Sequence, residues 1–319
     1  MATYTTLDFE TARELLRPYP LGEVCVFEVI EGGAENSSFR IQTDLGDWCL
    51  TVYNKKSFAQ VSLLAKIYER LQEEGFPTPE VIRAGEAVVT RFGDRPLIVK
   101  TYIQGEVSSH MSEEMCAELG HVLAVLHEIG PPNGLPVQHA YGAASFFAIT
   151  EATIGDPFRE WLSEKARFLA SRIPDDLPRV FAHGDAFYDN VIFHQGHLAG
   201  LIDFEEAALL PASFDLGMAV LGTCFTGERL EVRKCAALLA GYQARRSLGH
   251  AERELLPVMI EYAAVATAFW RFRQYRYMQP EPDLQDHHAE MVARADFVHA
   301  MSAAEFLGGE HGSEKAKDA

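Results

Sequence analysis

The sequence predicts an α+β fold of two lobes, a small strand-rich lobe followed by a larger, mostly helical lobe. Short β-prone runs separated by turn residues fill most of residues 1–104. Segments with apolar residues at helical spacing fill most of residues 105–307, and one short β-rich stretch at 180–204 interrupts them. The last residues, 308–319, are small and charged without periodicity, so we expect a disordered tail.

The first lobe is expected to contain a short first helix, an inserted second helix and five strands. Asp8 precedes the first helix and can cap it. The second helix is expected over residues 57–74, with Gly75 as its C-terminal cap. The strands are expected at residues 24–30, 38–43, 48–53, 88–91 and 97–102.

The second lobe is expected to consist mainly of helices. Ser112 is a candidate cap for the first of them, which covers residues 112–129 and has two glutamates in its first turn. The further helices are expected at residues 157–171, 213–223, 229–246, 251–278 and 286–306.

Composition excludes several classes of protein. With 28 basic and 46 acidic residues the formal charge is −18, which would repel nucleic acid and anionic membranes, so we expect neither as a partner. No uncharged apolar run of about 18 residues and no secretory signal pattern appears, so we expect a cytoplasmic location. The five cysteines form no CxxC pair, which argues against a disulfide framework or a zinc site.

The stretch between Phe181 and Glu205 contains the residues that we expect to catalyse a reaction. It reads His-x-Asp-x-x-x-x-Asn, then a hairpin turn, then Asp-Phe-Glu. Phosphoryl transfer needs a carboxylate that accepts the proton of the attacking hydroxyl, and oxygen ligands that hold a divalent cation beside the phosphates. Asp185 is the expected base, and Asn190 and Asp203 are the expected metal ligands.

These motifs resemble those of the aminoglycoside phosphotransferase and choline kinase superfamily, which shares the protein-kinase fold. The resemblance extends over most of the chain and is greatest to the homoserine kinases of that superfamily. It implies ATP in the cleft between the lobes, Mg²⁺ at Asn190 and Asp203, and Asp185 as catalytic base. Besides the catalytic block, the stretches that carry it are residues 33–39, 50–53, 75–79, 119–127, 214–217 and 268–273.

Two residues are expected to support the catalytic loop. His183 is too close to Asp185 in sequence to share its role, and we interpret it as a buried brace that donates hydrogen bonds to backbone. Asp215 matches a superfamily aspartate that caps a helix and braces the loop; the alternative is an ordinary helix N-cap.

The resemblance places the nucleotide-binding residues in the first lobe and at its end. The segment after Gly32 and Gly33 stands where a loop covers the phosphates, although it lacks GxGxxG. The link between the lobes is expected to contact the nucleotide as well. The residues concerned are Asn36, Ser37 and Ser38 in the first segment and Thr101, Tyr102 and Ile103 in the link.

One departure from the superfamily concerns the lysine that many members carry on the third strand to hold the phosphates. Thr51 occupies that position here. We hypothesise that Lys55, expected on the same strand face, or Lys56 replaces it; the alternative is that both are solvated turn lysines. Lys100 ends another strand near the link between the lobes.

The acceptor substrate is expected in the helical lobe. Arg273 is the candidate for binding a carboxylate, since a guanidinium can do so bidentately; the alternative is an interhelical ion pair. Glu205 is a candidate for binding an ammonium group, and Tyr188 and Asp189 are expected to line the same pocket.

These residues favour an ATP-dependent kinase that converts L-homoserine to O-phospho-L-homoserine. The alternatives are choline, ethanolamine or an aminoglycoside as the acceptor, or a nucleotide-binding pseudokinase. An intact set of Asp185, Asn190 and Asp203 argues against the pseudokinase. A monomer and a homodimer are both compatible with the sequence.

Overall fold

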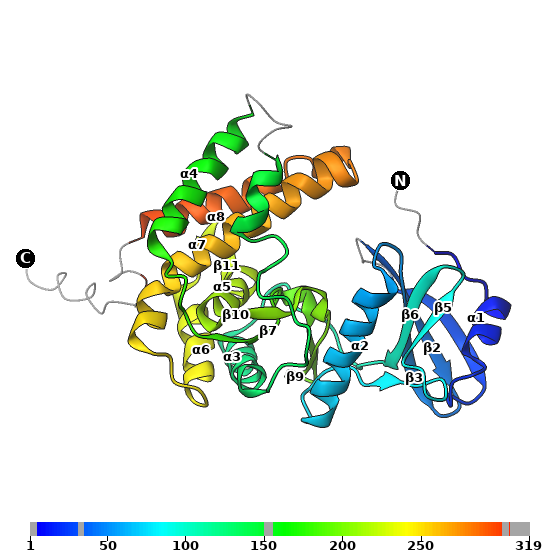
Figure 1. The fold of residues 1–319 in the computed structure, drawn as a ribbon. Coiled ribbons are helices and arrows are strands. Elements are labelled where there is room, and N and C mark those ends of the chain that lie inside the picture. Colours follow the sequence, from blue (N-terminus) through cyan, green and yellow to red (C-terminus); the bar gives the residue numbers. More distant parts are fainter. Residues whose placement is uncertain (1–4, 31–34, 150–155, 302–305, 307–319) are drawn as a thin grey trace, which may run out of the picture.

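The computed structural model describes residues 5–30, 35–149, 156–301 and 306. It has two lobes, one built on a sheet with α1 and α2 and the other containing α3 to α8 (Figure 1). This is the predicted α+β architecture with a strand-rich first lobe and a helical second lobe. The predicted tail, 308–319, and the two glycines of the phosphate loop lie outside the described residues.

The first lobe is built on an antiparallel sheet with six strands in the described part of the chain. Five of them lie in the order β1-β2-β3-β6-β4, and β5 also pairs with β6. The sequence predicts five strands, because β4 has only two residues and shows no alternation. The strands are β1 (Val24–Ile30), β2 (Asn36–Thr43), β3 (Gly46–Tyr53), β4 (Val81–Ile82), β5 (Val89–Phe92) and β6 (Arg95–Thr101).

The two faces of this sheet pack against different helices. On one face, Leu50 and Val52 pack in a hydrophobic cluster with Leu16 of α1. On the other face, Tyr53 and Ile98 pack in a cluster with α2. Both helices begin as predicted, at Asp8 and at Ser57, whose side chains accept hydrogen bonds from the first turn. The bounds are Phe9–Leu16 for α1 and Phe58–Glu73 for α2.

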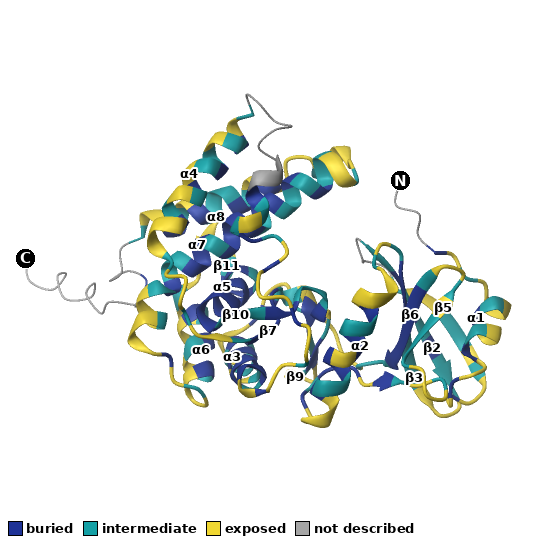
Figure 2. Cartoon of the chain, viewed as in Figure 1, coloured by how far each residue is buried: buried dark blue, intermediate teal, exposed yellow. Residues whose placement is uncertain are grey.

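The second lobe surrounds α5, most of which is buried (Figure 2). Its helices agree closely with the predicted segments, and Ser112 caps α3 through the Met115 N–H. Three two-stranded sheets join them, and β10, β11 and β12 lie beyond the predicted β-rich stretch. The helices are α3 (Glu113–Glu128), α4 (Pro157–Arg172), α5 (Ala212–Thr223), α6 (Val232–Gln243), α7 (His250–Arg273) and α8 (His288–Ala300). The paired strands are β7 (Arg179–Ala182) with β10 (Ala208–Pro211), β8 (Val191–His194) with β9 (His197–Leu201), and β11 (Phe225–Thr226) with β12 (Arg229–Leu230).

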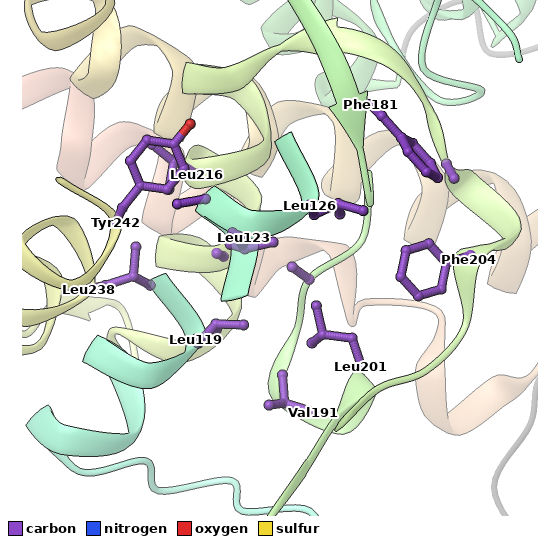
Figure 3. Close-up of a cluster of buried hydrophobic side chains, with 14 of the residues drawn as sticks. Leu119, Leu123, Leu126, Phe181, Val191, Leu201, Phe204, Leu216, Leu238 and Tyr242 are labelled. Atoms are coloured by element: carbon purple, nitrogen blue, oxygen red, sulfur yellow. The ribbon is translucent and has the colours of Figure 1, made fainter. Parts of the chain in front are cut away.

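One hydrophobic cluster joins the two lobes. It runs from α2 and Phe76 through Phe204 to α3, α5 and α6. Figure 3 shows its central part, where leucines of α3 lie near Leu201 of β9 and Tyr242 of α6. The two lobes therefore share one continuous apolar core, which includes Ala186 and Val191 on either side of the predicted metal ligand Asn190.

The helix predicted to run to residue 278 is α only as far as Arg273. A π-helical turn, Gln274–Met278, follows α7, and there the i, i+4 relation of an α-helix no longer holds. Tyr277, in this turn, is exposed and contacts the Phe272 ring. The segment His250–Met278 is long and apolar enough to cross a membrane, but 61% of its most apolar window is buried in the fold, as in a core helix.

The close packing of α3 against α6 gives a first testable prediction, for Gly241→Ala. A Cβ atom at Gly241 would overlap the backbone of Ala117 in α3. We expect the substitution to lower the free energy of unfolding by about 1–3 kcal/mol, because α3 and α6 must separate to admit a methyl group. Urea denaturation measures the change. Gly130→Ala is the control, since the nearest atom there belongs to the flexible Arg70 side chain; equal stability of the two variants would contradict the prediction.

Candidate active site

A buried carboxylate holds the first turn of the predicted catalytic loop, between β7 and β8. Asp215 accepts hydrogen bonds from the backbone N–H groups of His183 (2.9 Å) and Gly184 (2.7 Å), and His127 Nε2 lies 2.9 Å from it. Burial favours a raised pKa for Asp215, but its bonds to His127 and the backbone outweigh burial and lower that pKa. Asp215 lies inside α5, whose N-cap position is Pro211, so the expectation that Asp215 caps a helix is wrong in both interpretations, whereas its contacts are those of a residue that braces the loop.

His183 is fully buried and uses both ring nitrogens within the loop. Nδ1 accepts a hydrogen bond from the Asp185 N–H (3.2 Å), and Nε2 donates one to the Ile202 carbonyl (2.9 Å). Burial lowers the pKa of His183, so the ring is held neutral. His183 therefore links the loop to the end of β9 and has no nitrogen left for a substrate proton.

Asp185 and Asn190 face each other across the loop. Asn190 Nδ2 donates to the Asp185 carbonyl (2.8 Å) and to its carboxylate Oδ2 (3.1 Å). The Asn190 carbonyl in turn accepts from the Ile202 N–H (3.0 Å), which places Asn190 next to the residue before Asp203. The hairpin β8–β9 thus brings together the three residues that the sequence predicts for catalysis and metal binding.

Negative charge accumulates around Asp185. Burial first, and then the charges of Asp203, Asp189 and Glu206, raise the pKa of the Asp185 carboxyl well above its usual range. A divalent cation beside these groups would offset the repulsion.

The donors present fit such a cation. Asp203 has left-handed backbone geometry (φ 63°, ψ 69°) and an exposed side chain that accepts a hydrogen bond from the Glu205 N–H. No cluster of three His, Cys, Asp or Glu side chains with metal-binding geometry occurs among the described residues. One carboxylate and one amide oxygen suffice for Mg²⁺, which takes its remaining ligands from water and phosphate oxygens.

The Glu205 side chain forms its polar contacts with residues of the first lobe. Its carboxylate accepts a hydrogen bond from Asn36 Nδ2 and lies 3.0 Å from Lys56 Nζ. Burial and the nearby Asp203 raise the pKa of Glu205 to about 7, against the effect of Lys56. The prediction that Glu205 faces the acceptor is therefore not supported by its contacts, which fix β2 and the end of β3 to the catalytic segment.

The serines of β2 point to opposite faces of the sheet. Ser38 pairs with Thr51 of β3, and their hydroxyl oxygens lie 3.3 Å apart on the face toward α2. Ser37 points the other way, where it is buried and accepts hydrogen bonds from the Thr5 N–H (2.8 Å) and Asn54 Nδ2 (3.1 Å). The expectation that Ser37 contacts the nucleotide is wrong, because its alternation in the strand turns it away from the cleft.

The link between the lobes follows β6 directly. The Thr101 N–H donates to the Glu80 carbonyl (2.8 Å), and the Arg40 guanidinium lies over the Tyr102 ring at 4.7 Å from its centroid. The side chain of Ile103 lies against β9. These contacts hold the link between the sheet and the β8–β9 hairpin.

A small pocket of about 130 Å³ lies where α7 meets the first lobe. Lys55 Nζ lies 3.5 Å from Glu35 Oε1 and 3.0 Å from Gln279 Oε1. Arg273 forms no ion pair or hydrogen bond within the described part of the chain, so the alternative of an interhelical ion pair is not observed. The lining residues are Glu35, Lys55, Tyr141, Trp270, Arg273, Gln274 and Met278.

Three predicted residues lie away from the places expected for them. Strand β3 ends at Tyr53, so Lys55 does not continue its face and instead lines this pocket. Tyr188 packs against the hydrophobic cluster that joins the lobes, and Asp189 is exposed on the following turn. Neither residue lines the pocket with Arg273, although both flank the catalytic loop as expected.

Tyr141 was not predicted from the sequence. It lines the pocket, packs at 6.0 Å from the Trp270 ring, and lies near enough to Glu206 to lower the pKa of that carboxyl. Burial raises the pKa of Glu206 to about 7, against the charge of Lys56. Because the negative charge of Glu206 also raises the pKa of Asp185, Glu206 links the pocket electrostatically to the catalytic loop. Tyr141 lies in a loop without periodicity, so no sequence pattern could have indicated it.

Comparison with known proteins identifies the family of this chain. The model of the phosphotransferase enzyme family matches residues 26–255. The homoserine kinase of Gluconobacter oxydans (strain 621H) is 31% identical over 277 residues, which cover 83% of this chain and 87% of that protein. The homoserine kinase of Methylorubrum populi is 32% identical over 291 residues, which cover 88% and 90%.

Solved structures show the same fold at lower identity. A microcompartment-associated aminopropanol kinase superposes with a TM-score of 0.71 at 16% identity and covers 94% of this chain and 99% of its own. Spectinomycin phosphotransferase, in complex with ADP and spectinomycin, gives a TM-score of 0.68 at 15% identity, with 93% and 99% covered. With the family match and these relatives, the chain belongs to the phosphotransferase enzyme family.

Proposed function

We propose that this chain transfers the γ-phosphate of ATP to the hydroxyl group of L-homoserine. The choice of acceptor rests on Arg273, which has no ion-pair or hydrogen-bond partner among the described residues and lines a small pocket near the catalytic loop. The identity with homoserine kinases supports the same acceptor.

The catalytic loop supplies the base for an in-line transfer. The acceptor hydroxyl donates a hydrogen bond to Asp185, and its oxygen forms a bond to the γ-phosphorus while the bond to the β,γ-bridging oxygen breaks. The hydroxyl proton passes to Asp185, and ADP leaves with the electron pair of the broken bond. Asn190 holds the Asp185 carboxylate in place through its 3.1 Å hydrogen bond, and Asp215 holds the loop.

The nucleotide is proposed to lie between the sheet and the β8–β9 hairpin. Asn190 and Asp203 would hold Mg²⁺ there, and the ion would neutralise charge that develops on the phosphate oxygens. Asn36 and Ser38 stand on the cleft face of β2, while residues 101–103 border the opposite end of the cleft.

The pocket matches an amino acid that carries a hydroxyl group. Arg273 offers a planar fork of donors to an α-carboxylate, and the aromatic rings of Tyr141 and Trp270 line the same pocket. Glu35 on the pocket wall and Glu206 behind Tyr141 are acids that can attract an α-ammonium group. Choline and ethanolamine lack the carboxylate and would leave Arg273 without a partner.

A coupled assay of ADP release tests the acceptor. Purified protein with ATP and Mg²⁺ is offered L-homoserine, choline, ethanolamine and an aminoglycoside, and kcat/KM is compared. We expect L-homoserine to have the highest value. A larger value for choline, ethanolamine or the aminoglycoside would replace the proposed acceptor, and no turnover of any of them would favour the pseudokinase.

Arg273→Gln tests how the acceptor is bound. We expect the KM for L-homoserine to rise about 10- to 100-fold, because a charge-assisted contact to the carboxylate is lost. The KM for ATP should stay nearly unchanged, since Arg273 lies on the acceptor side.

Arg245→Gln is the matched control for this substitution, because Arg245 is exposed in the turn after α6 and pairs with Glu128. Steady-state kinetics with each substrate varied in turn separate the two KM values. Equal KM values for L-homoserine in Arg273→Gln and Arg245→Gln would contradict the proposed role.

A further inference from the structure

Lys100 lies on β6, the strand next to β3. It pairs with Cys49 across the two strands, and Thr51 pairs with Ile98. Cross-strand partners point to the same face, so Lys100 and Thr51 are diagonal neighbours on the face toward α2. Diagonal neighbours lie about 7–8 Å apart, a distance that a lysine side chain can span.

The ammonium group of Lys100 is buried without an anionic partner. Lys100 is 9% exposed, and its Nζ lies 3.5 Å from the Tyr68 hydroxyl and 4.8 Å from the centroid of the Tyr68 ring. No carboxylate lies within ion-pair distance in the described part of the chain. A buried charge in such a place is costly unless a counter-charge is supplied.

The charge nevertheless lies close to the predicted phosphate site. Burial favours a lowered pKa for Lys100, but Tyr68, Cys49 and Asp203 together raise that pKa, so the side chain stays protonated. The negative charge of Asp203, one of the proposed metal ligands, contributes to the raised pKa of Lys100. The positive charge of Lys100 in turn acts to lower the pKa of Glu205. The Lys100 side chain lies against Tyr68 of α2, on the same face of the sheet as Thr51.

The two lysines favoured by the sequence already have carboxylate partners. Lys55 pairs with Glu35 at 3.5 Å in the acceptor pocket, and Lys56 pairs with Glu205 at 3.0 Å. Of these three lysines, Lys100 alone has no acid within ion-pair distance among the described residues. An incoming anion would meet its positive charge unopposed.

We propose that Lys100 binds the phosphate chain of the nucleotide. It replaces the lysine that many members of the superfamily carry on the third strand, at the position that Thr51 occupies here. This inference rests on the proposed use of ATP. The side chain reaches from β6 to the space beside Thr51, where its ammonium donates hydrogen bonds to phosphate oxygens. The Tyr68 hydroxyl holds the ammonium in the absence of nucleotide.

Isothermal titration of Lys100→Met with ATP, ADP and adenosine, with Mg²⁺ present, tests this role. We expect the Kd for ATP and ADP to rise about 10- to 100-fold, as for the loss of a charge-assisted hydrogen bond. The Kd for adenosine should not change, because it has no phosphate. Lys66→Met is the matched control, since Lys66 is exposed on α2.

A second variant moves the charge instead of removing it. In Thr51→Lys/Lys100→Met the lysine stands on β3, and we expect most of the lost ATP affinity to return. Lys100→Arg keeps the charge in place and should retain more ATP affinity than Lys100→Met. Thermal melting of each variant confirms that it is folded, and Lys100→Gln serves as the neutral variant if Lys100→Met does not fold.

Three outcomes would overturn the inference. They are an unchanged Kd for ATP in the neutral variant, an equal loss of adenosine and ATP affinity, and no recovery in the double variant. A wild-type chain that binds none of the nucleotides would contradict the proposed function itself, and this inference with it. A wild-type chain that binds ATP no more tightly than the neutral variant would contradict the inference alone.

Discussion

Asp185→Asn is expected to lower kcat by about 10²- to 10⁴-fold, the contribution of a general base. The amide can still accept the hydrogen bond from Asn190 Nδ2, so the loop should keep its shape. It cannot accept the proton of the acceptor hydroxyl, and the transfer loses its base. Because the change removes one negative charge from a cluster that includes Asp203, nucleotide binding should persist or strengthen.

Single-turnover kinetics and ATP titration of this variant separate the two effects. Asp175→Asn is a suitable control, since Asp175 is exposed between α4 and β7. A kcat for Asp185→Asn that matches that of Asp175→Asn would show that another group accepts the proton.

Asp215→Ala is expected to have the largest effect on stability. The substitution leaves the backbone N–H groups of His183 and Gly184 without acceptors and separates His127 from its carboxylate. Removing one member of a buried charged network costs about 3–5 kcal/mol. Urea denaturation should show that loss, whereas Asp176→Ala, at an exposed position, should stay near the wild type.

Asp215→Asn distinguishes a positioning role from a purely structural one. The asparagine side chain has the same shape as aspartate and keeps one acceptor oxygen. Its NH₂ group, however, would face either a backbone N–H of the loop or His127, where the carboxylate oxygen now accepts a hydrogen bond. We expect kcat to fall at a temperature where the variant is fully folded, with the KM values little changed. A variant that is less stable but has the wild-type kcat would show that Asp215 does not position the loop for catalysis.

The helices and the catalytic set could be predicted because their determinants are local in sequence. Asp8 and Ser112 cap helices whose apolar residues repeat at helical spacing. Asp185, Asn190 and Asp203 lie on one loop and one hairpin, so their spacing alone brings them together. The fold followed from the same patterns and from the resemblance to kinases.

The remaining parts of the site depend on contacts between distant segments. Glu205 meets Asn36, which lies 169 positions away, and no local pattern indicates that pairing. The direction of Ser37 depends on the register between β2 and β3, and the burial of Lys100 depends on α2. The π-helical turn after α7 likewise leaves no signal in the apolar spacing.

The left-handed backbone at Asp203 limits which amino acids that position can tolerate. At φ 63° a side chain other than Gly, Asn or Asp is strained, irrespective of its chemistry. In a library containing every substitution at this position, most variants would combine loss of a ligand with a misfolded turn. Glycine and asparagine would both remove the charge and keep the backbone, but only asparagine retains a side-chain oxygen, so Asp203→Asn is the substitution that isolates the effect of the charge on metal dependence.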